Sequence, residues 1–281
     1  MKTAMRWTLL SAALLWLTGA RAAEIFSFGV LPQRSALLTA QYWNPILDYV
    51  QGKTGVHLVL KVVRSAQESS AAIDRGQYDF VCSNAIFRQT TAETEYRVIL
   101  TLQNQTITSQ IVTLADSSVK NLRELQGRKV GFSSPVSFTG YAVPLDHLMR
   151  LGLSVDSVFG GNEEGILAQL KAGRVVAAGI NSQVLLVFAA REHLRYRVLW
   201  ESPAFLNLPL AAHPRVPTNA VRAVQVALDD MVHNPAGFKI LQASAQVIGQ
   251  APPYGFRRAH SADYLGYHQV IHQNTPLEST R

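Results

Sequence analysis

Residues 133–140, with the sequence SSPVSFTG, bring small hydroxyl side chains together between two regular segments. Residues 129–132 are typical of a strand, and residues 139–151 carry apolar side chains at helical spacing. Hydroxyl groups and free backbone N–H groups would then meet at the start of a helix, where the helix dipole favours negative charge. This arrangement predicts a site for a small anion. Simple capping of the helix by its serine and threonine residues is the open alternative.

Motifs for catalysis are absent from the sequence. It contains no Gly-x-Ser-x-Gly nucleophile motif, no phosphate-binding Walker loop and no His-Glu-x-x-His zinc motif. His268 and His272 have the spacing of two ligands on one helix, but no third ligand is recognisable, and a surface helix explains them better. We therefore predict a binding protein rather than an enzyme, without a metal site or a cofactor.

The first 22 residues have the three parts of a removable export signal. Lys2 and Arg6 precede an apolar run over residues 7–17, and the sequence ARA at positions 20–22 fits a cleavage site. This run is too short for an ordinary transmembrane helix, and no later run is long enough. We expect cleavage after position 22 or 23, and a mature chain that works in the periplasm without membrane insertion.

Charge and cysteine content exclude further classes of protein. The chain has 26 basic and 19 acidic residues, a net charge of +7, and this falls to +4 when Lys2, Arg6 and Arg21 leave with the signal. No basic run is interleaved with aromatic residues, so a nucleic-acid partner is not expected. Cys82 is the only cysteine and lies in an apolar run, which predicts a buried, inert thiol and excludes an internal disulfide.

Strand and helix patterns alternate along the mature chain. Strand-like runs at residues 25–30, 56–63 and 79–82 are separated by helical patterns at 43–50 and 66–75. This order predicts parallel strands with helices packed on their faces. Open sheets of this kind bind ligands at the carboxyl ends of their strands.

A second block of the same kind follows, with extended segments near 109–114 and 208–212 crossing between the two blocks. Its strands are expected at residues 129–132, 155–159 and 175–180, and its helices at 139–151 and 163–172. The sequence therefore predicts two lobes around a hinged cleft. Residues 23–112 and 208–281 would form lobe 1, and residues 113–207 lobe 2.

Five segments resemble one protein family: residues 29–32 (GVLP), 43–49 (WNPILDY), 76–80 (GQYDF), 116–130 (DSSVKNLRELQGRKV) and 134–141 (SPVSFTGY). The family comprises the periplasmic binding proteins of ABC transporters for phosphate, phosphite and phosphonates, and the resemblance covers nearly the whole mature chain. It implies an α/β fold of the type II periplasmic-binding-protein class. Each lobe would be a mainly parallel sheet flanked by helices, with the ligand cleft at the hinge.

The resemblance also implies roles for the hydroxyl-rich turn, which in this family holds the oxygens of a phosphoryl group. Ser137 and Thr139 would be the donors, beside Gly140, while Phe138 replaces a hydroxyl residue that is common in the family. A phenylalanine at this position resembles the motif of a family branch that is associated with membrane sensor proteins. The sequence therefore leaves two functions open: delivery of the ligand to an ABC permease, or signalling to a membrane kinase or cyclase.

Other positions depart from the family pattern. Where the family commonly has two tyrosines, this chain has Ala66 and a residue near Arg88. Glu163 stands where the family often has a histidine, and Val176 stands where it has an acidic residue. Arg88 could compensate with paired donors to an oxyanion. Glu163 at a helix start is explained by dipole stabilisation, or else it faces the cleft. Asn84 follows a strand end, where both ligand contacts and turns are common.

The sequence thus predicts a monomeric two-lobe protein that captures a small oxyanion of the phosphonate, phosphite or phosphate class and closes over it. The turn at 137–140 would hold the anion from lobe 2. The loops at 31–34 and 84–88 would close from lobe 1, because ligand contacts to both lobes make closure favourable.

Overall fold

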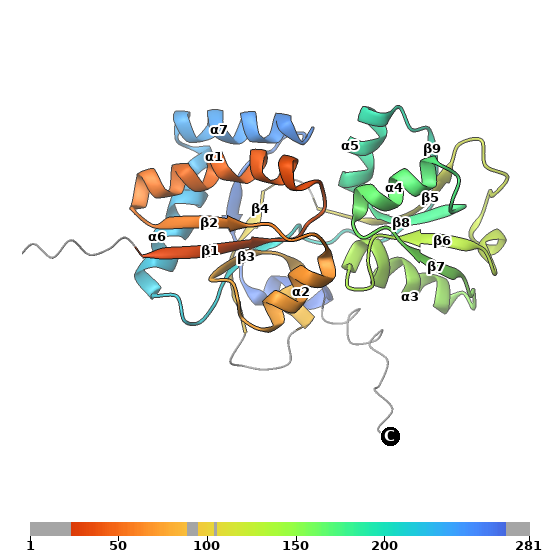
Figure 1. The fold of residues 1–281 in the computed structure, drawn as a ribbon, viewed down its shortest axis with the longest axis horizontal. Coiled ribbons are helices and arrows are strands. Elements are labelled where there is room, and N and C mark those ends of the chain that lie inside the picture. The colour runs from red at the N-terminus through yellow and green to blue at the C-terminus, as the bar shows by residue number, and fades with distance from the viewer. Residues whose placement is uncertain (1–23, 89–94, 104–105, 268–281) are drawn as a thin grey trace, which may run out of the picture.

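The chain folds into two lobes, each with one β-sheet flanked by helices (Figure 1). The computed structural model describes residues 24–88, 95–103 and 106–267, except for the side chain of Arg88. The predicted export signal at residues 1–22 lies outside the described residues. In the part of the chain that is described, no helix has the length and apolar character needed to cross a membrane.

Lobe 1 begins with the predicted unit of alternating strands and helices. β1 (Ile25–Val30) lies between β2 (His57–Lys61) and β3 (Phe80–Cys82), and both pairs are parallel. The connections are α1 (Ala36–Thr54) and α2 (Ala66–Asp74). The sequence prediction for this part of the chain is confirmed.

Three strands from more distant parts of the chain complete this sheet: β4 (Arg97–Leu102), β10 (Pro209–Ala212) and β11 (Phe256–Arg258). The strand order is β11-β4-β10-β3-β1-β2. β10 runs antiparallel to both β3 and β4, and β11 antiparallel to β4, so β4 points the same way as β1, β2 and β3. Four of the six strands of this sheet therefore point the same way, whereas three of its five pairings are antiparallel.

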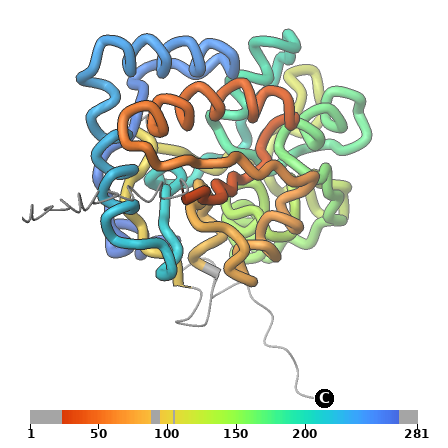
Figure 2. The backbone as a smooth tube through the Cα atoms, turned by 60° about the vertical axis from the view of Figure 1, so that its left-hand side comes forward, coloured from red at the N-terminus to blue at the C-terminus, as the bar shows by residue number. Residues whose placement is uncertain are grey.

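Alternate side chains of this sheet supply two cores, as the period of a strand requires. Phe28 and Phe80 pack on one face with α1, α6 (Thr218–Asp229) and α7 (Pro235–Val247). α1 and α7 lie side by side there (Figure 2). The other face is covered by α2 and by two 3-10 turns, η1 (Asn84–Arg88) and η6 (Ser261–Tyr264). A further 3-10 turn, η5 (Asp230–Val232), follows α6.

Lobe 2 has a sheet of its own in the order β7-β6-β8-β5-β9. The strands are β5 (Ser109–Leu114), β6 (Lys129–Phe132), β7 (Asp156–Phe159), β8 (Ala177–Asn181) and β9 (Tyr196–Glu201). The helices are α3 (Val143–Arg150), α4 (Glu163–Lys171) and α5 (Ser182–Glu192), with a 3-10 turn η3 (Leu122–Leu125). α4 and α5 cover one face of the sheet, and α3 the other. β6, β7 and β8 are parallel, whereas β5 runs antiparallel to β8 and β9.

Two segments cross between the lobes, between β4 and β5 and between β9 and β10. They touch each other through a β-bridge between Ile107 and Phe205. The predicted lobe boundary at residue 112 falls inside β5, whose strand partners all belong to lobe 2, so the first crossing ends before Ser109. The second crossing ends at Leu208, next to β10 of lobe 1.

The structure contains elements that the sequence patterns did not predict, namely α5, β4, β9 and β11. It also changes the start of the helix after the hydroxyl-rich turn. Residues Phe138–Ala142 form a π-helical turn, η4, that continues directly into α3.

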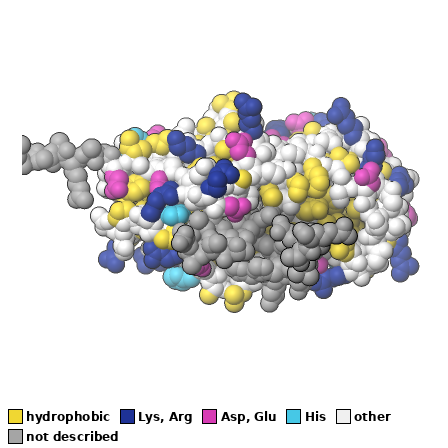
Figure 3. All heavy atoms as spheres, turned by 60° about the horizontal axis from the view of Figure 1, so that its bottom comes forward, with side chains coloured by type: hydrophobic (Ala, Val, Ile, Leu, Met, Phe, Trp, Pro, Cys, Tyr) yellow, Lys and Arg dark blue, Asp and Glu magenta, His cyan; other side chains and the backbone are white. Residues whose placement is uncertain are grey.

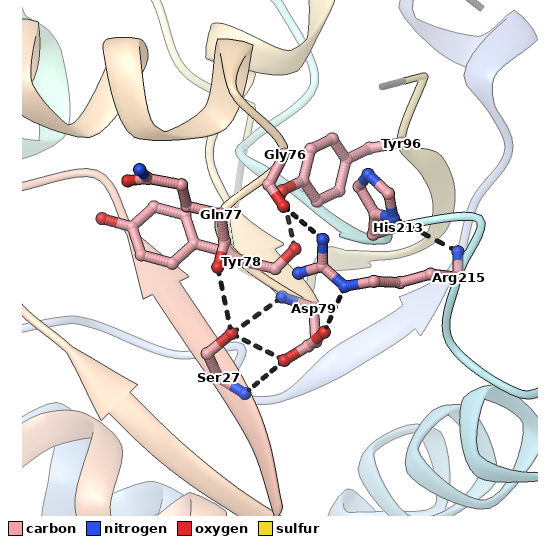
Figure 4. A network of polar contacts seen from close by, with 8 residues as sticks. All are labelled: Ser27, Gly76, Gln77, Tyr78, Asp79, Tyr96, His213 and Arg215. Atoms are coloured by element: carbon pink, nitrogen blue, oxygen red, sulfur yellow. Dashed lines mark hydrogen bonds and ion pairs between the residues drawn. The ribbon is translucent and has the colours of Figure 1, made fainter. Parts of the chain in front are cut away.

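A polar network joins β1, the start of β3 and the loop after β10 (Figure 4). The Asp79 carboxylate accepts hydrogen bonds from the backbone N–H and the hydroxyl of Ser27, at 2.8 and 2.7 Å. Arg215 binds the same carboxylate at 2.7 Å and also donates to the carbonyl of Gly76. Tyr96 donates to the carbonyl of Tyr78 at 2.8 Å. These contacts fix the end of lobe 1 that lies away from lobe 2.

The surface carries charges of both signs. On the face drawn in Figure 3, lysine and arginine side chains are scattered among acidic and apolar ones and do not gather into one patch. Electrostatic attraction would therefore act locally, at single sites, rather than across this face.

Candidate functional site

A cavity of about 80 Å³ lies between the lobes, beside the two crossings. It has room for several water molecules or a ligand of a few heavy atoms. Its lining comes from β1, the following loop and α1 on lobe 1, from the end of β8 and α5 on lobe 2, and from the crossings. The polar and aromatic residues of the lining are Gln33, Arg34, Thr39, Tyr42, Trp43, Asn181, Gln183, Asn207 and Gln250.

Arg34 is the cationic residue of this lining. It precedes Ser35, the residue that caps α1, and its side chain is half-buried. Its guanidinium has no hydrogen bond or ion pair with another residue of the described ranges. Burial lowers the pKa of Arg34, and the negative charges of Glu164 and Glu163 oppose that shift. A half-buried guanidinium without a partner is a natural anchor for an anion that enters the cavity.

Neutral hydrogen-bonding groups line the same cavity as Arg34. Asn181 and Gln183 come from lobe 2, Asn207 from a crossing, and Gln250 from the segment after α7. Amide side chains both donate and accept hydrogen bonds, so they can fit an anionic oxygen or a protonated group of a ligand. Tyr42 and Trp43 add apolar walls.

Asn181 connects this cavity with the hydroxyl-rich turn of lobe 2. Its side-chain oxygen caps α5 by accepting the N–H groups of Gln183 and Val184, at 2.9 and 3.4 Å. Its side-chain nitrogen donates to the hydroxyl of Thr139 at 3.4 Å. Its backbone N–H donates to the carboxyl of Glu163, also at 3.4 Å. One residue therefore faces the cavity and holds two of the predicted site residues.

The hydroxyl-rich turn forms as predicted at a helix start. Ser137 caps the π-helical turn, because its hydroxyl accepts the N–H of Gly140 at 3.2 Å. Thr139 is buried, and its carbonyl accepts the hydroxyl of Ser109 at 2.6 Å. The capping role is thus present for Ser137, and neither residue lines the cavity.

Glu163 lies against this turn rather than in solvent. It is the first residue of α4, only 4% of its surface is exposed, and the Ser137 hydroxyl donates to its Oε1 at 3.5 Å. The Asn181 N–H reaches Oε2. Burial raises the pKa of Glu163 to about 7, although hydrogen bonds from Asn181, Ser133 and Ser137 and the charge of Arg34 favour the ionised form.

Gly140 makes this close approach possible. A Cβ atom at this position would lie 2.3 Å from Oγ of Ser133, 2.7 Å from Oε1 of Glu163 and 2.9 Å from Oγ of Ser137. A side chain at this position would therefore force the two serine hydroxyls or the carboxyl to shift. The predicted residues Ser137, Gly140 and Glu163 are brought together, with Thr139 beside them.

Phe138 has a different environment. Its ring stacks on Tyr267 at 4.0 Å between centroids and meets Phe205 edge-on at 4.9 Å. Phe87 of η1 belongs to the same buried cluster, where its ring contacts Tyr264 and Tyr267. The contact of Phe138 is apolar and joins the lobes directly.

A further predicted residue is not brought to the cavity. Asn84 is buried at the start of η1 and does not line it. Arg88 ends η1, and its side chain lies outside the described part of the structure. Cys82 is buried as predicted and lines the cavity, and burial raises its pKa to about 12, which keeps the thiol protonated. Within the described ranges, histidine, cysteine and acidic residues form no cluster that could hold a metal ion.

Sequence reasoning included Arg34 in a closing loop but did not single it out. It also missed the roles of Gln183, Asn207 and Gln250. The available signal for Arg34 was its place after the first strand of a parallel unit, at the edge where ligands bind.

The sequence matches, over residues 28–264, the family described as the periplasmic substrate-binding protein of a phosphonate ABC transporter. A comparison with curated proteins gives no match.

Solved structures share the fold. PhnD1 from Prochlorococcus marinus, in complex with methylphosphonate, is 15% identical, with 89% of this chain and 97% of that chain covered and a TM-score of 0.73. A binding protein component of an ABC phosphonate transporter from Pseudomonas aeruginosa is 16% identical, with 88% and 85% covered and a TM-score of 0.73. XAC2383 from Xanthomonas citri, bound to a chloride ion, is 14% identical, with 89% and 98% covered and a TM-score of 0.70. The predicted type II two-lobe fold is confirmed.

Proposed function

Because the chain belongs to the family of periplasmic substrate-binding proteins of phosphonate ABC transporters, we propose that Arg34 anchors a phosphonate or related small oxyanion in the cavity between its lobes. The family binds substrates and does not transform them, so the chain is not an enzyme. The observation that carries the proposal is the Arg34 guanidinium, which lines the interlobe cavity without a partner among the described residues.

The position of the cavity supports capture by closure. Arg34 and Gln33 come from lobe 1, whereas Asn181 and Gln183 come from lobe 2. A ligand that contacts both lobes binds the closed form more tightly than the open form, and only such a difference shifts the equilibrium. The two crossings are the segments about which the lobes would rotate.

The partner of the closed form is, in this proposal, an ABC permease, and the protein acts as a monomer in the periplasm after removal of residues 1–22. The family match supports the transporter and the compartment. The comparisons lend no support to the sensor alternative.

The test is calorimetric titration of the mature chain, after unfolding and refolding to remove bound ligand. Methylphosphonate, 2-aminoethylphosphonate, phosphite, phosphate and sulfate are compared for wild type, Arg34→Gln and Arg34→Lys. Arg64→Gln, at an exposed arginine of the same lobe, is the matched control.

We expect at least one phosphorus oxyanion to bind. Arg34→Gln should weaken it about 10- to 100-fold, because hydrogen bonds to charged groups contribute roughly 1.5–3 kcal/mol. Arg34→Lys should recover part of the loss, since it keeps the charge without the paired donors. Equal affinity of wild type and Arg34→Gln would refute the anchor, and no binding of any phosphorus oxyanion would refute the proposed ligand class.

A further inference from the structure

One of the buried apolar clusters is shared between the two lobes. Most of its residues belong to lobe 1, but Phe138 and Val143 come from η4 and α3 of lobe 2. Phe205, in the second crossing, packs against it. The cluster lies on the side of the molecule on which α2 and α3 are found (Figure 1). Opening of the lobes would therefore bring part of an apolar core into contact with water, at a cost in free energy.

A face-to-face pair of rings makes the contact between the lobes in this cluster. The ring of Phe138 stacks on Tyr267 with 4.0 Å between the centroids and 19° between the planes. The ring of Phe205 lies edge-on to both, at 4.9 and 5.6 Å. Phe138 and Tyr267 expose only 3% and 2% of their surface. A gap of even one ångström removes much of the attraction between packed atoms, so rotation of one lobe against the other would break this pair.

Tyr267 is held to lobe 1 and to the second crossing at the same time. Its hydroxyl donates to the carbonyl of Leu206 at 2.6 Å. Tyr264, three residues earlier, donates to the carbonyl of Asn207 at 2.8 Å. The ring of Phe87, in η1 of lobe 1, packs against both tyrosines at 5.4 and 5.0 Å. The segment therefore lies across the crossing about which the lobes would rotate, and it presents the ring of Tyr267 to lobe 2.

We propose that Tyr267 and Phe138 form an aromatic clasp that favours the closed form of the two lobes before any ligand contributes. The clasp sets the ratio of open to closed protein from which a ligand starts, and the ligand supplies the rest of the closing free energy. The apparent affinity of a ligand for the closed form rises with the fraction of protein that is already closed. Because the clasp involves no ligand contact, it stands whether or not Arg34 anchors the transported ligand.

The test is the distance between the lobes, measured without ligand by pulsed electron paramagnetic resonance. The protein is the mature chain, after unfolding and refolding to remove bound ligand. Spin labels are attached at Lys61→Cys in lobe 1 and Arg174→Cys in lobe 2, both at exposed positions. The native Cys82 is buried, so the labels react with the two introduced cysteines.

In this labelled chain, Phe138→Ala and Tyr267→Ala each remove one ring of the clasp, and the double variant removes both. Tyr267→Phe keeps the ring and loses the hydrogen bond to Leu206. Phe238→Ala is the matched control, because it removes an aromatic contact with Tyr254 inside lobe 1. Where an alanine variant does not fold, the leucine variant of the same position takes its place, since leucine is apolar but cannot stack.

We expect the ratio of open to closed form to rise about tenfold or more in Phe138→Ala and in Tyr267→Ala, because each loses the stacked pair and the apolar area that it buries. The double variant should open no further than the single variants, since all three lack the same contact. Tyr267→Phe should open less than Tyr267→Ala, and Phe238→Ala should match wild type. Single variants with the distance distribution of wild type, or a double variant whose effect is the sum of the two, would overturn the proposal.

Discussion

The buried acid at position 163 gives the protein a pH-dependent stability that a single substitution should remove. Burial raises the pKa of Glu163 from 4.5 to about 7. An acid whose pKa is raised in the folded state stabilises that state at low pH, and the stabilisation is lost as the pH rises through the folded pKa. A pKa difference of one between the folded and unfolded states corresponds to about 1.4 kcal/mol of unfolding free energy, so the full effect is about 3 kcal/mol.

The assay is urea unfolding of wild type and Glu163→Gln from pH 5 to pH 9. Glutamine keeps the size of the side chain and cannot ionise. We expect the wild type to lose about 2–3 kcal/mol relative to Glu163→Gln over this range, most of it below pH 8. Glu164→Gln, one residue along α4, is the matched control: it keeps Glu163, so it should lose stability with rising pH as wild type does. A pH-independent difference between wild type and Glu163→Gln, or a wild type that gains stability as the pH rises, would refute the reasoning.

Three further predictions concern the surroundings of the site and the far end of lobe 1. Gly140→Ala should cost roughly 1–3 kcal/mol in urea unfolding, because its Cβ meets Ser133 and Glu163, whereas Gly52→Ala, which meets nothing within 4 Å, should not destabilise. Phe138→Ala should cost about 3 kcal/mol or more and make lobe opening easier, seen as a larger radius of gyration in solution scattering; an unchanged radius would contradict a role in closure. Burial alone would raise the pKa of Asp79, but hydrogen bonds from Ser27 and the charge of Arg215 outweigh burial and lower it. Asp79→Asn should therefore lose about 1 kcal/mol of unfolding free energy at pH 7. In strong acid, where wild-type Asp79 is protonated, the variant and wild type should be equally stable.

Short-range patterns were enough to predict much of the fold. β6 was placed at residues 129–132 because a small apolar run was bounded by Gly127 and by the hydroxyl-rich turn. The helices after it were found from apolar spacing and glycine stops. These signals are local, so they do not depend on where the partner strand lies.

The elements that escaped prediction lack such signals. In α5 the sequence from Val184 to Ala190 is almost wholly apolar and follows β8 without a glycine or proline, so no period separates helix from strand. Asn181, which caps α5, was the one available sign. β4 pairs with β10 and β11, which lie more than 100 residues away in the sequence. Nothing in the sequence of β4 itself indicates these partners.

The candidate site shows the same limit at the level of single side chains. Glu163 was correctly expected at a helix start, where either dipole stabilisation or a cleft contact could explain it. The structure adds burial against Ser137, which is 26 residues away in the sequence. The direction of a first-turn side chain depends on what packs there, and this cannot be read from the helix alone.

The division of charge between the lobes determines how a ligand would drive closure. Arg34 supplies the cation from lobe 1, while lobe 2 offers neutral amides, Asn181 and Gln183, and keeps the Glu163 carboxyl buried. An anion held by Arg34 alone would bind the open and closed forms equally, and equal binding shifts no equilibrium. Closure therefore requires a ligand with hydrogen-bonding atoms that reach the amides while its anionic oxygens stay on Arg34. A group as small as chloride should bind without closing the lobes, and a phosphonate or phosphite, with several oxygens, should close them.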